Sequence, residues 1–146
     1  MEREKEPASQ ESTGYVDKLM AALDHPDPTV RLNAAHILGE KKAVRGVPAL
    51  IEAYRRNIID PYILKEIVWA LGEIGDPRAF DLLASALRRS FLLVRVEAAK
   101  SLGKMGDIRA IPILEEATGD INVSVREEAQ KALAKLRPVN RRGDFV

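Results

Sequence analysis

The segment that decides the fold is Val30-Arg-Leu-Asn-Ala-Ala-His-Ile-Leu-Gly39, because variants of it recur along the 146-residue chain. The copies end at Gly39, Gly72, Gly103 and Ala134, which lie 33, 31 and 31 residues apart. Small and apolar residues occupy the first, fifth, eighth and ninth places of each copy, a spacing that lines one face of an α-helix. A period of this length predicts a protein built from repeated helical units.

A second apolar pattern lies between the copies, for example at Val47, Leu50 and Tyr54, and it predicts another helix in each unit. The unit is therefore a helical hairpin, which cannot bury its apolar stripe alone and must stack on its neighbours. The sequence predicts an all-α fold, a right-handed α-solenoid of about four hairpins over residues 14–137. The charged segments 1–13 and 138–146 are expected to be disordered tails.

Two segments, residues 27–39 and 94–110, resemble HEAT-like repeats of the phycobilisome-lyase type, and the resemblance extends over about residues 14–137. It implies that the recurring segments form inner helices on a concave face. It also implies a ladder that ties one repeat to the next, with the members Arg31, Arg95, Arg126, Asp76 and Asp107. Leu64 replaces the arginine of the second copy, so we expect that rung to be missing. Because this family includes scaffolds, lyases, a metal hydroxylase and DNA-repair proteins, the resemblance predicts a fold and no single function.

The residue types present leave few parts for catalysis. The chain has no cysteine, which excludes disulfides and thiolate metal sites, and its only imidazoles are His25 and His36. The resemblance implies that the related hydroxylase holds two irons with His-Glu pairs, whereas here His25 precedes Pro26 and His36 precedes Ile37. We therefore expect no enzyme activity, no metal, no cofactor and no small-molecule substrate.

The location is predicted from what the sequence lacks. No apolar run approaches the roughly 18 residues of a membrane helix, and the first residues lack the apolar stretch of a signal peptide. We expect a cytoplasmic protein without a membrane partner. The few Asn and Gln residues and the absence of Cys favour a thermostable protein.

The candidate binding site lies on the inner helices, on the side opposite the core stripe. Its members combine apolar and cationic side chains around the only tryptophan of the chain: Leu32, His36, Tyr62, Lys65, Trp69, Leu93, Val96 and Lys100. Exposed apolar patches that include Trp and Tyr commonly mark protein interaction sites. The sequence therefore predicts a protein-binding module or small scaffold that presents its concave face to another protein. The alternative is that Trp69 and Leu93 are simply buried.

Two other functions remain open. The same patch could join copies of this chain into a homo-oligomeric structural protein. Nucleic acid could instead bind the outer-helix arginines, Arg55, Arg56, Arg88 and Arg89. Nucleic acid is disfavoured because cations at helix C-termini are also stabilised by the helix dipole, and because the formal net charge of the chain is only +1.

Overall fold

The computed structural model describes the backbone of residues 8–137 and the side chains of residues 13–88 and 90–137. This part of the chain forms eight α-helices joined by short connections, and it contains no strand. The first helix begins at Ala8, inside the segment predicted to be a tail. Residues 1–7 and 138–146, which complete the two predicted tails, lie outside the described residues.

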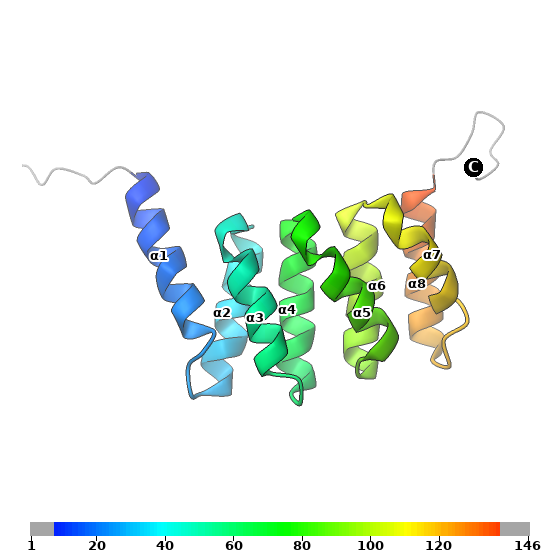
Figure 1. Cartoon of the computed structure of the whole chain (residues 1–146), viewed down its shortest axis with the longest axis horizontal. Helices are drawn as coiled ribbons and strands as arrows, with labels where there is room; N and C mark the ends of the chain where they lie inside the picture. Colours follow the sequence, from blue (N-terminus) through cyan, green and yellow to red (C-terminus); the bar gives the residue numbers. More distant parts are fainter. Residues whose placement is uncertain (1–7, 138–146) are drawn as a thin grey trace, which may run out of the picture.

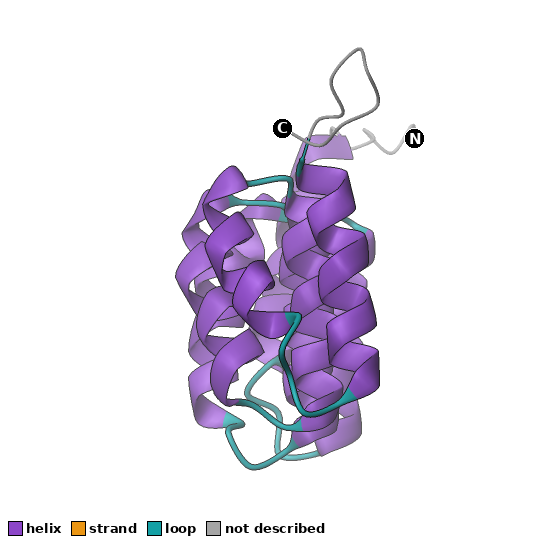
Figure 2. Ribbon diagram, turned by 90° about the vertical axis from the view of Figure 1, so that its right-hand side faces the viewer, coloured by secondary structure: helices purple, strands orange, loops and turns teal. Residues whose placement is uncertain are grey.

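The helices alternate between two layers. The outer layer contains α1 (Ala8–Ala22), α3 (Val47–Arg56), α5 (Phe80–Arg89) and α7 (Ile111–Ala117). The inner layer contains the four recurring segments, as α2 (Pro28–Glu40), α4 (Pro61–Ile74), α6 (Leu92–Met105) and α8 (Val123–Leu136). Figure 1 shows the helix pairs following one another along the long axis, and Figure 2 shows the two layers from the end of the array. The predicted all-α solenoid is confirmed.

Aspartate side chains cap the N-termini of the first two inner helices. The Asp27 carboxylate accepts a hydrogen bond from the Thr29 N–H at 2.8 Å, and Asp60 accepts one from Tyr62 at 3.0 Å. Each aspartate is followed by a proline, whose missing N–H is not needed in the first turn. The Asp-Pro pairs therefore fix where α2 and α4 begin, and with them the positions of the side chains on the inner face.

A continuous core lies between the two layers. Leu38, Leu71 and Leu102 of the inner helices are fully buried, as are Leu50 and Leu83 of the outer ones. Burying one such leucine contributes about 2 kcal/mol, so the stacking of successive hairpins stabilises the array.

Glycines bring successive inner helices into very close contact. A Cβ added at Gly72 would lie 2.9 Å from the Cα of Ser101, and one added at Gly103 would lie 2.9 Å from the Cα of Ala132. Gly39 approaches Ala70 in the same way. Contacts between successive inner helices are more extensive than those between successive outer helices. The inner helices are therefore packed more closely on one another than the outer helices are.

Arginine rungs join successive repeats as the resemblance implied. The Arg31 Nε donates a hydrogen bond to the Asn57 side-chain oxygen at 3.1 Å. Two nitrogens of Arg95 donate to the Asp120 carboxylate at 3.0 and 3.2 Å. Arg126 donates to the backbone oxygen of Asp120 at 2.9 Å, which keeps its contact inside the loop before α8.

The implied roles of two aspartates need correction. Asp76 and Asp107 pair with Arg78 and Arg109 of their own turns, not with the ladder arginines. Both carboxylates also accept a backbone N–H from the same arginine, and these hydrogen bonds lower the pKa of each aspartate. These aspartates therefore hold the local turns and do not join the repeats.

The rung of the second copy is missing, as expected. Leu64 is buried, and it lines a groove of about 430 Å³ together with Tyr54, Ser90 and residues of the adjoining loops. A hydrogen bond of 2.9 Å between the Tyr54 hydroxyl and the Ser90 hydroxyl joins the two repeats instead. The junction between the second and third repeats is thus more apolar than the others.

Candidate functional site

The predicted site residues differ in their exposure. Leu32, Trp69 and Val96 are half-buried and pack against the core. His36 is also half-buried, whereas the remaining predicted members, Tyr62, Lys65, Leu93 and Lys100, are exposed. Only some of the predicted apolar members are therefore accessible from solvent.

His36 and Trp69 form a polar and aromatic cluster between α2 and α4. The two rings stack, with centroids 4.8 Å apart. The His36 Nδ1 lies 2.5 Å from a Glu66 oxygen, and the Nε2 lies 3.4 Å from a Glu40 oxygen. The hydrogen bond with the Glu66 carboxylate is the main cause of a raised His36 pKa. An imidazolium here donates to the Glu66 carboxylate and pairs with Glu40 while it covers one face of the indole.

The indole of Trp69 is also held at its edge. Its Cζ3 is so close to Gly39 that a Cβ added there would lie 2.6 Å away. The ring is therefore wedged between the two inner helices and shielded by His36. The sequence allowed two alternatives for Trp69, an exposed binding residue or a buried core residue. Its half-buried position is intermediate between them.

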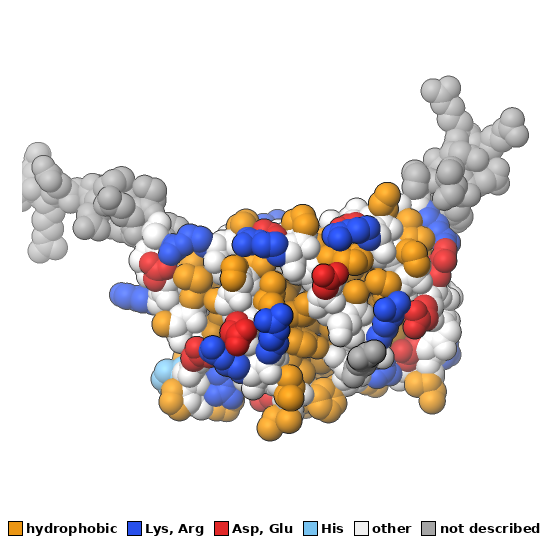
Figure 3. All heavy atoms as spheres, viewed as in Figure 1, with side chains coloured by type: hydrophobic (Ala, Val, Ile, Leu, Met, Phe, Trp, Pro, Cys, Tyr) orange, Lys and Arg blue, Asp and Glu red, His pale blue; other side chains and the backbone are white. Residues whose placement is uncertain are grey.

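Tyr62 and Leu93 belong to a different surface. They stand at the starts of α4 and α6, beside loop residues that are just as accessible. We call this surface the apolar edge; its members are 40–85% exposed and are Ile58, Ile59, Tyr62, Phe91, Leu92 and Leu93. Ile58 and Phe91 line the same groove, so the loops of the second and third repeats lie side by side. Figure 3 shows hydrophobic side chains gathered along the lower border of the molecule.

Four members of the apolar edge were not predicted from the sequence. Ile58, Ile59 and Phe91 lie in the loops before the inner helices, Leu92 is the first residue of α6, and all four fall outside the stripe on which the site was predicted. One signal could have found two of them, because the stretch from Leu50 to Ile63 is two residues longer than the corresponding stretches of the other copies and contains two adjacent isoleucines.

A column of carboxylates runs along the inner face. Glu66, Glu97 and Glu128 occupy the same position in the second, third and fourth repeats. Glu66 contacts His36, and Glu128 accepts a hydrogen bond from Lys131 at 3.1 Å. Glu97 is only 7% exposed, and within the described part of the chain its carboxylate has no hydrogen bond or ion pair.

The surroundings of Glu97 disfavour its charged form. Burial is the largest cause of its raised pKa, and the carboxylates of Glu66 and Glu128 raise the pKa further. Lys100 and Lys65 oppose this effect through their positive charges. Lys65 and Lys100, two of the predicted site residues, therefore act on Glu97, the one member of the column that lacks a direct partner.

Glu97 opens into a groove of about 440 Å³, which we call the inner groove. The groove contains one aromatic and several charged side chains, and its lining includes Trp69, Glu73, Glu97, Lys100, Lys104 and Glu128. Lys104 pairs with Glu73 across the groove, from one repeat to the next. Glu73, Lys104 and Glu128 are paired, whereas no ion pair of Glu97, Lys100 or Lys135 occurs among the described side chains, so the inner groove can hold a charged group of a ligand.

The outer face carries many arginines in ion pairs. Arg55 pairs with Glu52, Arg56 with Asp24, and Arg88 with Glu116; the side chain of Arg89 is outside the described part. In Figure 3 the cationic and anionic side chains are interspersed on this face. Because each described cation of this group has a nearby anion, the predicted nucleic-acid surface lacks the uncompensated charge that phosphates require.

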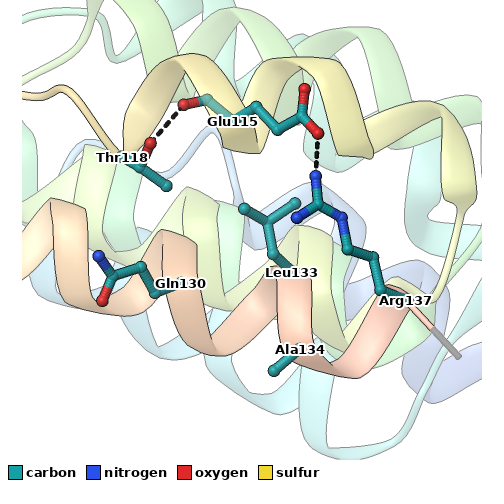
Figure 4. Close-up of a pocket in the computed structure, with 6 residues that line it drawn as sticks. All are labelled: Glu115, Thr118, Gln130, Leu133, Ala134 and Arg137. Atoms are coloured by element: carbon teal, nitrogen blue, oxygen red, sulfur yellow. Dashed lines mark hydrogen bonds and ion pairs between the residues drawn. The ribbon is translucent and has the colours of Figure 1, made fainter. Parts of the chain in front are cut away.

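A pocket of about 330 Å³ lies between α7 and α8 at the end of the array. Figure 4 shows Glu115 and Arg137 pointing toward one another above Leu133, with Gln130 further along α8. The Thr118 hydroxyl donates to the backbone oxygen of Glu115 at 2.6 Å. The polar groups of this pocket are therefore largely satisfied by one another.

The described residues contain no group of three or more His, Cys, Asp or Glu side chains that could hold a metal ion. None of the helices in residues 8–137 is both long and apolar enough to cross a membrane.

Paired helices stacked in two layers, with arginine rungs between the pairs, define a helical repeat protein. The chain belongs to the family of HEAT repeats, whose model matches residues 16–91 and 56–134. The resemblance found in the sequence is thereby confirmed.

Three known proteins are similar to parts of this array. The chain is 36% identical over 87 residues to the uncharacterized phycocyanin operon protein Y of Pseudanabaena tenuis, a match that covers 53% of this chain and 20% of that protein. Human deoxyhypusine hydroxylase, solved in complex with glycerol, superposes with a TM-score of 0.74 at 26% identity, over 88% of this chain and 45% of that one. The chain also superposes on the complex of CpcE and CpcF of phycocyanin lyase from a Nostoc species. The TM-score is 0.61 at 20% identity, over 93% of this chain and 70% of that one. The chain thus spans about a fifth of the curated relative.

The expectation that the chain is not an enzyme is wrong. It is overturned by the similarity to a hydroxylase and to the subunits of a lyase, which are enzymes built on this fold. The physical reason is that adjacency in the sequence is a poor guide in a solenoid. His36 and Glu66 contact each other although they are 30 residues apart. A missing His-Glu dipeptide therefore cannot exclude a catalytic arrangement.

Proposed function

We propose that the chain is a protein-binding module whose contact surface is the apolar edge together with the adjoining concave inner face. The observation that carries this proposal is the exposure of six large apolar side chains at the starts of two neighbouring inner helices, with Ile59 at 85% and Tyr62 at 65%. Contiguous apolar surface of this kind is rare on monomeric proteins unless it binds something. A partner would remove it from water.

The composition of the apolar edge favours a protein as that partner. Tyr62 and Phe91 provide the aromatic side chains that most often dominate the binding energy of protein interfaces. Asp60, the cap of α4, lies between Ile59 and Tyr62, while residues 91–93 include no charged side chain. The partner surface should accordingly be apolar at its centre, and Lys65 and Lys100 would lie toward its polar rim.

The relatives support partner binding by analogy. CpcE and CpcF form a complex, so arrays of this fold do assemble with other proteins, although that likeness is at 20% identity. The homo-oligomeric alternative uses the same apolar edge, because a patch of this kind can pair with its own copy around a two-fold axis. The nucleic-acid alternative is disfavoured because Arg55, Arg56 and Arg88 are already paired with acidic side chains.

A charge placed in the apolar edge tests the proposal. Immobilised protein should capture a partner from native lysate, and Ile59→Glu should reduce that capture by at least about tenfold, because a buried unpaired charge opposes binding. Ile121→Glu is the matched control, since Ile121 is 93% exposed but lies on the loop before α8. Light scattering of the same variants detects self-association. Equal capture by all three proteins would contradict the proposed surface.

A further inference from the structure

Of the charged side chains that the structure describes, only that of Glu97 is buried. A carboxylate taken out of water is costly unless a cation or hydrogen-bond donors compensate it. Its counterparts in the neighbouring repeats have such partners, His36 for Glu66 and Lys131 for Glu128. Among the described side chains of residues 13–88 and 90–137, Glu97 has no such partner, apart from the more distant charges of Lys65 and Lys100.

The carboxyl group of Glu97 is nevertheless accessible from one side. No buried side-chain oxygen or nitrogen in the described part is both unpaired and sealed from solvent. The side chain lines the inner groove, which also contains Trp69 and has a volume of about 440 Å³. An unpaired acceptor and an aromatic wall therefore line the same space.

We propose that the inner groove binds the guanidinium group of an arginine side chain from a partner polypeptide, with the carboxylate of Glu97 as its counter-ion and Trp69 as its aromatic wall. A guanidinium group is planar, donates two parallel hydrogen bonds to one carboxylate, and stacks on aromatic rings. It is also more weakly hydrated than an ammonium group, which favours it in a half-closed groove.

The other charges at the groove permit this assignment. Lys104 is occupied by Glu73, so its charge is already compensated. The remaining lysines that act on Glu97, Lys65 and Lys100, are exposed, and their effect is opposed by Glu66 and Glu128. Lys135 also lines the groove, but within the described side chains neither it nor Lys100 forms a hydrogen bond or ion pair with Glu97, so the Glu97 carboxylate stays open to an incoming cation.

This inference rests on the proposed function for the source of the arginine, but the site can be tested without a partner. The probe is N-acetyl-arginine methylamide, and Trp69, the only tryptophan of the chain, reports binding by fluorescence. We expect a saturable change in emission, and Glu97→Gln should weaken the binding by at least about tenfold. Glu127→Gln, which removes an exposed carboxylate from α8, is the matched control and should bind the probe as the unmodified protein does.

A second probe separates charge from shape. N-acetyl-citrulline methylamide has a similar shape but no charge, and it should not bind. In the unmodified protein, saturation with the arginine probe should also lower the pKa of the Glu97 carboxyl, followed by carbon NMR, because a bound cation favours the carboxylate. This measurement needs no variant to fold.

Three results would overturn the inference: no saturable binding of the arginine probe, equal binding by Glu97→Gln, or equal binding of the citrulline probe. None of them affects capture of a partner through the apolar edge. Conversely, loss of the proposed function would appear as capture that is insensitive to Ile59→Glu while the arginine probe still binds. The two proposals therefore fail separately.

Discussion

The imidazole of His36 lies flat on the indole of Trp69, with their planes inclined by only 13°. The two residues occupy the same position in consecutive repeats, so a solenoid with a period of 33 residues brings them face to face. Glu66 fixes the imidazole from the second repeat and Glu40 from the first. One polar contact between the first two inner helices thus depends on the charge of His36.

Stability should therefore vary with pH through His36. Its folded pKa is raised from 6.5, so its stabilising contribution is complete at pH values below 6.5 and is lost as the pH rises through the folded pKa. Urea unfolding followed by circular dichroism between about pH 5.5 and 9 should show this decline. His36→Gln should remove it, whereas His25→Gln should not. A decline that persists in His36→Gln would contradict this origin.

Removal of the Trp69 indole should lower the stability of the protein moderately. Trp69→Ala should lower the free energy of unfolding by about 2 kcal/mol, less than the roughly 3 to 5 kcal/mol typical of a fully buried aromatic residue, because Trp69 is half-buried. Tyr62→Ala, at a 65% exposed aromatic residue, should stay within about 0.5 kcal/mol. Denaturant unfolding of both variants measures the difference. A cost of about 4 kcal/mol or more for Trp69 would identify it as a core residue.

The arginine rungs should contribute more to the free energy of unfolding than the surface ion pairs do. Arg95→Leu, which copies the residue of the second repeat, should cost about 1 to 3 kcal/mol because it leaves the nearly buried Asp120 without its charged partner. Arg88→Leu breaks an exposed pair with Glu116 and should cost no more than about 1 kcal/mol. Thermal and urea unfolding of the two variants give the comparison. Equal costs would mean that the rung at Arg95 is no more than a surface contact.

A methyl group at an inner-helix glycine should destabilise the array. In Gly72→Ala the new Cβ would lie 2.5 Å from the Cβ of Ser101, and such overpacking costs about 1 to 3 kcal/mol. That cost exceeds the gain of about 1 kcal/mol from the better helix propensity of alanine. Gly14→Ala in α1 meets no atom within 4 Å, so it should stabilise the protein. Melting temperatures that rise in both variants would disprove the close approach at Gly72.

The fold was predictable because the same pattern of apolar residues occurs in every repeat. The spacing of Val30, Ala34 and Leu38 recurs, so an error at one position is corrected by the others. The missing arginine rung of the second copy was also predictable, because Leu64 departs from the pattern. The roles of Asp76 and Asp107 did not follow, because a turn aspartate can pair with a neighbour as easily as with the next repeat.

The candidate site was less predictable because it depends on neighbours that are about a repeat apart. Glu66, Glu97 and Glu128 are equivalent in the sequence, and only the structure reveals that Glu97 lacks the partner that the other two have. Burial of Trp69 likewise depends on His36 and on the absence of a side chain at Gly39. The members of the apolar edge that were not predicted lie in loops or at the first position of a helix, where the periodic pattern gave no signal.

The glycine contacts of the inner layer have a geometrical consequence for the whole array. At Gly39, Gly72 and Gly103 the next inner helix occupies the space of a missing methyl group, whereas the fourth repeat has that methyl group in Ala134. A methyl group at any of the first three positions would force two inner helices apart without a matching change in the outer layer, and so would alter the angle between those two repeats. The shape of the inner face, and with it the shape of a partner that can fit against it, therefore depends on the absence of one methyl group in each of the first three repeats.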